Sequence, residues 1–131
     1  MLSVLLVEDH AILASVLARM LLNTGNLEVT VVAGTAEEAL RQLPEQQFDL
    51  ALVDVFLPEM SGISLVALMR EQYPDLPCLM LSGHMLDYYV QSSLDAGARG
   101  YVLKDKSDEI LEGIQHVLQG ETYVSSELRD V

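Results

Sequence analysis

The stretch FDLALVDVFLP at residues 48–58 constrains the fold more than any other part of the chain. Residues 50–53 are apolar without interruption, Asp54 follows them, and Pro58 stops a strand from continuing. An unbroken apolar run is typical of a strand covered on both faces, as in a parallel sheet between helices. Sites in open parallel sheets lie outside the carboxyl ends of the strands. Asp54 therefore either belongs to a site or caps the next turn, a common role for Asp, and this stretch alone does not decide.

Apolar runs of strand length alternate with segments of helical periodicity along the whole chain. The runs lie at residues 2–7, 29–32, 50–53, 76–81 and 101–103, and the helical segments at 11–23, 35–43, 62–73, 85–96 and 110–118. The first helical segment has a predicted buried stripe of Leu13, Val16, Leu17, Met20 and Leu21, and the second opens with the capping box Thr35-Ala-Glu-Glu38. This alternation predicts an α/β fold with a parallel sheet, helices on both faces and right-handed crossovers. It does not fix the strand order, although 2-1-3-4-5 is one of the two common doubly wound solutions.

Length and charge limit what the chain can bind. A chain of 131 residues is expected to form one domain with a substantial core. Seven Lys and Arg against twenty Asp and Glu give a net charge of -13. Such a surface repels phosphate backbones, so we expect no direct nucleic-acid binding by this stretch. The same charge suits a divalent cation or a basic partner.

Cysteine and hydropathy indicate a cytoplasmic location. The single cysteine, Cys78, rules out an internal disulfide and fits a reducing compartment. The apolar residues 1–7 lack a basic leader, and no run is long enough to span a bilayer, so we expect no membrane association. Residues 121–131 are polar and mostly outside the pattern. We therefore assign the domain to residues 1–120 and a C-terminal tail, or the start of a linker, to residues 121–131.

Polar side chains directly follow four of the five predicted strands. They are Glu8 and Asp9, Asp54, Ser82, and Lys104. Because parallel strands end at one edge of the sheet, these side chains are expected to gather there. Three carboxylates, one hydroxyl and one ammonium at corresponding positions are hard to explain as independent loop choices. We interpret them as one site.

The residue types at this edge suit phosphoryl chemistry. Crowded carboxylates repel one another, and this repulsion either raises their pKa values or favours binding of a divalent cation, Mg²⁺ or Mn²⁺. Asp54 is then a carboxylate nucleophile that forms an aspartyl-phosphate. Lys104 and the Ser82 hydroxyl are placed to hold phosphoryl oxygens. The sequence shows neither a Ser-His-Asp triad nor a zinc spacing, and we interpret His10, His84 and His116 as surface or loop residues.

In this order and spacing, the motifs resemble the receiver domain of two-component response regulators. They are Glu8-Asp9, Asp54-Val-Phe-Leu-Pro58 with Gly62, Ser82, and Tyr101-Val-Leu-Lys104. The resemblance covers residues 2–120. Gly100-Tyr-Val-Leu-Lys-Asp105 and Gly120-Glu-Thr-Tyr123 are most similar to the NarL/FixJ (LuxR-type) subfamily, whose receivers precede a helix-turn-helix DNA-binding domain. The resemblance implies a flavodoxin-like (βα)5 fold, a five-stranded sheet in the order 2-1-3-4-5.

The resemblance also implies a role for each site residue. Asp54 would accept phosphate from a sensor histidine kinase or a phosphotransfer protein. Asp9, Asp54 and the backbone carbonyl of Phe56 would bind Mg²⁺, with Glu8 acting through water. Receiver dimers are common in the family, so a homodimer is a further partner to expect.

Two residues would carry the switch that the resemblance implies. These are Ser82 and Tyr101. Ser82 and Lys104 would hold the phosphoryl group, and Tyr101 would turn inward when Ser82 moves toward that group. The chain would act as a signalling phosphoacceptor rather than an enzyme, catalysing only its own phosphorylation and dephosphorylation. Its output would be transcription through a DNA-binding domain absent from this chain. A single-domain regulator that acts through protein contacts is the alternative.

Departures from the family pattern separate the remaining alternatives. Glu8 stands where Asp is commoner, and no proline follows Lys104. Phe56 stands where phosphatases with an Asp nucleophile place their general acid, so it disfavours that class. The acidic Glu8-Asp9 pair disfavours a flavodoxin-like cofactor binder, which needs a loop that cradles phosphate. We further expect the Phe56 ring to shield the acyl phosphate from water.

Overall fold

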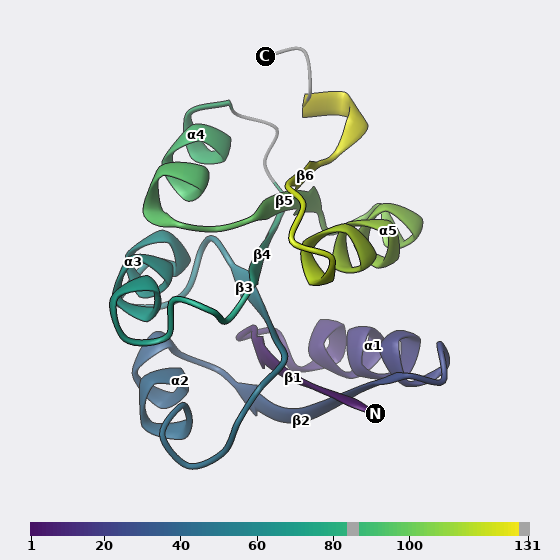
Figure 1. Cartoon of the computed structure of the whole chain (residues 1–131), viewed down its shortest axis with the longest axis horizontal. Helices are drawn as coiled ribbons and strands as arrows, with labels where there is room; N and C mark the ends of the chain where they lie inside the picture. The colour runs from purple at the N-terminus through teal and green to yellow at the C-terminus, as the bar shows by residue number, and fades with distance from the viewer. Residues whose placement is uncertain (84–86, 129–131) are drawn as a thin grey trace.

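The computed structural model describes residues 1–83 and 87–128, and strands alternate with helices along them (Figure 1). The elements are β1 (Leu2–Val7), α1 (Ala11–Leu22), β2 (Leu27–Ala33), α2 (Ala36–Gln42), β3 (Leu50–Asp54), α3 (Gly62–Gln72), β4 (Cys78–Ser82), α4 (Asp87–Ala96), β5 (Gly100–Leu103), α5 (Ser107–Leu118), β6 (Tyr123–Val124) and a 3-10 helix at Ser126–Leu128. The predicted alternation is confirmed. Within the described residues, no helix is long and apolar enough to cross a membrane.

The sheet has the doubly wound order that the sequence suggested. Its strands lie in the order β2-β1-β3-β4-β5-β6, and every neighbouring pair is parallel. Helices α1 and α5 cover one face, and α2, α3 and α4 cover the other (Figure 1). The expected order 2-1-3-4-5 and the helices on both faces are confirmed.

β3 is buried on both sides at the centre of the sheet. All five of its residues are buried. Ala51 and Val53 face the core under α2, α3 and α4, whereas Leu50 and Leu52 face the core under α1 and α5. This explains the unbroken apolar run, because both alternating sets of side chains are removed from water. Asp54 is thus attached to a strand that is packed on both faces.

Strand register brings the ends of β1, β3, β4 and β5 together. Val7 pairs with Val53, so Glu8 and Asp54 emerge side by side. Asp54 pairs with Leu81, and Ser82 pairs with Leu103, the residue before Lys104. The site is therefore a direct consequence of the register.

The short strand β6 was not predicted. Tyr123 and Val124 pair in parallel with Gly100 and Tyr101, and Ser125 follows with its Oγ accepting a hydrogen bond of 3.0 Å from the Leu103 amide. Two residues are too few to show an alternating or apolar pattern, so the sequence indicated only a polar tail. The division of the chain at residue 120 stays a prediction.

Helix α1 is rotated relative to the predicted stripe. It buries Ala14, Leu17 and Leu21, whereas the Val16 side chain is exposed. The prediction for Val16 was wrong because Val16 lies about 200° around the helix from Ala14. The capping prediction was closer, since Thr35 accepts a hydrogen bond of 3.1 Å from the Glu38 amide. The Glu38 carboxylate bonds the Gly34 amide instead of the Thr35 amide that a capping box predicts.

Gly62 lets α3 begin directly against the end of β3. A Cβ at Gly62 would overlap the carbonyl oxygen of Asp54. The Gly62 amide donates a hydrogen bond of 2.9 Å to the Val55 carbonyl, and the Ser61 side chain caps the helix. The connecting loop contains Glu59 at a φ of 69°, which is unfavourable for a residue with a side chain. Gly62 thus fixes the path of the chain after Asp54.

Candidate functional site

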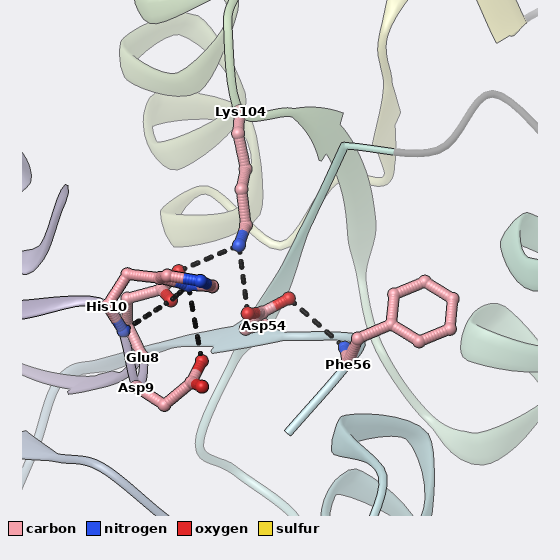
Figure 2. A network of polar contacts seen from close by, with 6 residues as sticks. All are labelled: Glu8, Asp9, His10, Asp54, Phe56 and Lys104. Carbon is pink, nitrogen blue, oxygen red and sulfur yellow. Dashed lines mark hydrogen bonds and ion pairs between the residues drawn. The ribbon is translucent and has the colours of Figure 1, made fainter. Parts of the chain in front are cut away.

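The predicted site residues lie at one edge of the sheet, and Figure 2 shows those that surround Asp54. Glu8 and Asp9 follow β1, Asp54 ends β3, Ser82 ends β4 and Lys104 follows β5. Backbone hydrogen bonds hold these ends in place, since the Glu8 amide bonds the Ala33 carbonyl and the Lys104 amide bonds the Ser82 carbonyl, each at 2.9 Å. The edge that the sequence predicted is confirmed as the place where these residues meet.

Lys104 reaches across the edge to two buried carboxylates. Its Nζ lies 2.8 Å from Asp54 Oδ2 and 3.0 Å from Glu8 Oε1. The side chains of Glu8 and Asp54 are 0% and 2% exposed, whereas that of Lys104 is 19% exposed. The Phe56 amide donates a hydrogen bond of 3.1 Å to the other Asp54 oxygen, Oδ1. Asp54 is therefore fixed at both oxygens (Figure 2).

The pKa values at the site result from two opposing effects, burial of the charged groups and their contacts with hydrogen-bonding or oppositely charged neighbours. Burial raises the pKa of Asp54, and the bonds from Lys104 and Phe56 only partly oppose it, while the charge of Glu8 adds to it. Burial also opposes ionisation of Glu8, but contacts with Lys104 and His10 outweigh it and lower its pKa. Burial would lower the pKa of Lys104, but the two carboxylates raise it instead. Lys104 is thus held charged, and Asp54 is the carboxylate that resists ionisation.

Four residues at this edge can contribute donor atoms to a cation. One oxygen or nitrogen each from Glu8, Asp9, His10 and Asp54 lie within 4.8 Å of one another. Three carboxylates against one ammonium leave an excess of negative charge, which a divalent cation would balance. The three carboxylates of this donor set therefore fit Mg²⁺, as predicted. Coordination by the Phe56 carbonyl stays a prediction.

His10 belongs to this cluster, although we expected only a surface or loop residue. Its ring is 70% exposed, but Nδ1 lies 3.1 Å from Glu8 Oε2 and 3.4 Å from Asp9 Oδ1. The sequence showed that His10 follows the acidic pair Glu8-Asp9, but it could not show that the ring turns toward those carboxylates. His116 instead pairs with Glu121 at 2.8 Å, away from the site, and His84 lies outside the described residues.

Ser82 and Tyr101 are buried near Asp54. Both residues are 0% exposed. Burial raises the pKa of the Tyr101 hydroxyl, and a hydrogen bond with Ser82 partly opposes that rise. The two residues that the resemblance implies as a switch are therefore in contact. Their roles stay predictions.

The Phe56 ring lies beside Asp54 rather than over its carboxylate. Figure 2 shows the ring directed away from Asp54, and it packs edge-to-face against Tyr89 of α4 with centroids 4.9 Å apart. Tyr89 in turn contacts the exposed Tyr88 at 5.6 Å. The Phe56 residue is 41% exposed. The contact with α4 joins distant segments, so no local pattern could have indicated it.

Comparison with known protein families identifies one match. A family model described as "Response regulator receiver domain" matches residues 4–115, which contain every site residue named above. MctR of Rhizobium johnstonii, a transcriptional regulatory protein, is 38% identical over 131 residues, covering 97% of this chain and 60% of MctR. DevR/DosR of Mycobacterium tuberculosis, a DNA-binding transcriptional activator, is 34% identical over 96% of this chain and 58% of its own length. The chain thus spans about 60% of the length of these relatives.

Solved structures show the same fold. A LuxR-family two-component response regulator from Aurantimonas sp. superposes with a TM-score of 0.95 at 26% identity, covering 98% of this chain and 93% of that chain. The signal receiver domain of the putative response regulator NarL from Mycobacterium tuberculosis superposes with a TM-score of 0.85 at 27% identity, covering 92% of this chain and 98% of that one.

Proposed function

This chain belongs to the family of response regulator receiver domains, and on that premise we propose that Asp54 is its phosphoacceptor. The phosphoryl donor is the phosphohistidine of a sensor histidine kinase or a phosphotransfer protein. The observation that carries the proposal is that Lys104 pairs with two buried carboxylates, Asp54 and Glu8, and that Asp54 ends a strand packed on both faces.

The transfer is a displacement at phosphorus. An Asp54 carboxylate oxygen forms a bond to phosphorus while the bond from phosphorus to the donor imidazole nitrogen breaks, and its electron pair returns to the imidazole. The raised pKa of Asp54 is consistent with a carboxylate that gains from losing part of its charge in this reaction. Lys104 is 2.8 Å from Asp54 Oδ2, close enough to pair with a phosphoryl oxygen once Asp54 carries the phosphoryl group as an acyl phosphate.

A divalent cation completes the site. Asp9, Asp54 and the Phe56 carbonyl would hold Mg²⁺ or Mn²⁺, and Glu8 would act through water. Glu8 is in direct contact with Lys104, which supports an outer position for it. When bound, the cation offsets negative charge on the phosphoryl oxygens.

Ser82 and Tyr101 transmit the modification. The Ser82 hydroxyl donates to a phosphoryl oxygen and leaves its bond with Tyr101, whose ring then repacks. Phosphorylation biases an equilibrium between existing conformations. Transcription is the output we propose, because MctR and DevR/DosR are transcriptional regulators. Regulation through protein contacts, including a homodimer, is the alternative.

Intact mass measurement after incubation with acetyl phosphate and Mg²⁺ tests the proposal. The native chain is expected to gain one phosphoryl group, and Asp54→Asn is expected to gain none. Asp75→Asn, which removes an exposed carboxylate, is the matched control and should behave like the native chain. Absence of any gain in the native chain, or a gain that survives Asp54→Asn, would contradict the proposal.

A further inference from the structure

His10 brings an imidazole nitrogen into the carboxylate cluster of the acceptor site. The His10 amide and ring Nδ1 both contact Glu8 Oε2, each at 3.1 Å. Nδ1 also lies 3.4 Å from Asp9 Oδ1. Two contacts to one buried carboxylate therefore orient a ring that is otherwise largely exposed (Figure 2).

Helix capping does not account for the position of this ring. His10 is the N-cap residue of α1, yet its side chain makes no capping hydrogen bond. A capping side chain would accept from the amides of the first helical turn. The His10 ring instead turns toward the site.

The spacing of the donor atoms matches that of ligands on one metal ion. Two donors each about 2.1 Å from a metal, at bond angles of 90–109°, lie roughly 3.0–3.4 Å apart. The observed separation from Nδ1 to Oδ1 of Asp9, the carboxylate proposed above as a direct ligand, is 3.4 Å. The widest separation in the cluster is within 4.8 Å, somewhat above the roughly 4.2 Å that opposite ligands span, so small side-chain rotations suffice.

A buried oxygen of Glu8 provides a second observation. Glu8 Oε1 is completely buried and pairs at 3.0 Å with Lys104 Nζ, an ammonium that it shares with Asp54 Oδ2 at 2.8 Å. An ionised oxygen in that position is incompletely satisfied, which costs free energy that a nearby cation offsets.

We propose that His10 is a metal ligand of the acceptor site and that it favours divalent transition metals such as Co²⁺ and Zn²⁺ over Mg²⁺. Mg²⁺ binds oxygen donors, whereas imidazole suits the later first-row metals and zinc. The inference rests on the proposed function, because it concerns the same cation site. It assigns to that site a second class of cation and a nitrogen ligand.

Titration with Co²⁺, followed by its visible absorption, measures the contribution of His10. The His10→Ala variant is expected to bind Co²⁺ on the order of tenfold more weakly than the native chain. Its affinity for Mg²⁺, measured by competition, is expected to change less than threefold. His116→Ala is the matched control, because it removes a histidine outside the cluster, and should leave Co²⁺ binding unchanged.

Pulsed EPR of bound Mn²⁺ tests ligation directly. Coupling to a ¹⁴N nucleus is expected in the native chain and in His116→Ala, and not in His10→Ala. Equal Co²⁺ affinity in the native chain and His10→Ala, or nitrogen coupling that persists in His10→Ala, would overturn the inference.

The two proposals fail separately. Phosphoryl uptake on Asp54 without a nitrogen signal overturns the role of His10 and leaves the proposed function standing. A His10-dependent nitrogen signal without any phosphoryl uptake supports the metal site and overturns the proposed function.

Discussion

Replacing the proposed phosphoacceptor, Asp54→Asn, is expected to stabilise the fold at neutral pH. Asn keeps the shape of the side chain and its acceptor for the Phe56 amide, but removes a buried charge. The sign of the stability change depends on three contributions: the lost attraction to Lys104, the lost repulsion from Glu8 and Asp9, and the cost of burying the Asp54 charge.

The distances allow an order-of-magnitude comparison. At an effective dielectric constant of about 20, the 2.8 Å contact with Lys104 is worth roughly 6 kcal/mol of attraction. Like charges within 4.8 Å repel by roughly 3.5 kcal/mol each, and the share of Asp9 is smaller because it is partly exposed. Attraction and repulsion nearly cancel, so the cost of burying the Asp54 charge, several kcal/mol, decides. We expect a gain of about 1 kcal/mol or more in the free energy of unfolding.

The pH dependence follows from the pKa of Asp54. Burial raises that pKa in the folded state above its ordinary value of 3.8. The stability that protonated Asp54 contributes is therefore fully present below about pH 3.8 and is lost as pH rises through the folded-state pKa. The advantage of Asp54→Asn should appear over that range and persist at pH 7.

Urea and thermal unfolding of both proteins measure this difference. At pH 7 the variant should melt about 3–5 °C higher than the native chain. Asp75→Asn, at an exposed carboxylate, should lie within about 0.5 kcal/mol of the native chain. A loss of 1 kcal/mol or more in Asp54→Asn would refute the reasoning, because it would mean that the ion pair with Lys104 outweighs burial and repulsion.

Four further predictions concern the surroundings of the site and the core. Gly62→Ala should cost about 2–4 kcal/mol in urea unfolding, because its Cβ would overlap the Asp54 carbonyl; an unchanged midpoint would contradict this close packing. Glu59→Gly should increase the free energy of unfolding by up to about 1 kcal/mol, and so raise the melting temperature slightly, because glycine adopts a φ of 69° without strain. A lower melting temperature would show that the Glu59 side chain stabilises the loop. Phe56→Asn should shorten the lifetime of the phosphorylated protein, measured by intact mass over time, because a polar side chain admits and orients water; an equal or longer lifetime would rule out shielding by the ring. Burial raises the pKa of the Cys78 thiol to about 12, so at pH 8 a disulfide reagent should label it roughly a thousandfold more slowly than a free thiol; rapid labelling of the folded chain would contradict its burial.

The strands and the site edge were predictable because they depend on short-range patterns. An unbroken apolar run identified β3, and parallel strands place the residues that follow them on one edge. Glu8, Asp54 and Lys104 therefore could be grouped before their contacts were known, and in the structure Lys104 Nζ lies within 3.0 Å of both carboxylates.

Features that depend on tertiary contacts were not predictable. The Phe56–Tyr89 contact joins the β3–α3 loop to α4, and no spacing in the sequence encodes it. β6 consists of two residues that gain their partners only after α5 returns the chain to β5. His10 was visible in the sequence as a neighbour of two carboxylates, but only its ring orientation shows that a nitrogen faces them.

Locating the phosphoryl group tests the central claim most directly. Reduction of the phosphorylated chain with borohydride converts an aspartyl-phosphate to homoserine, and peptide mass spectrometry then identifies the position. Homoserine is expected at position 54 after treatment with acetyl phosphate and Mg²⁺, and none is expected at that position when the donor or the metal is omitted. Homoserine at another aspartate, or a phosphoryl group on a residue other than Asp54, would contradict this claim.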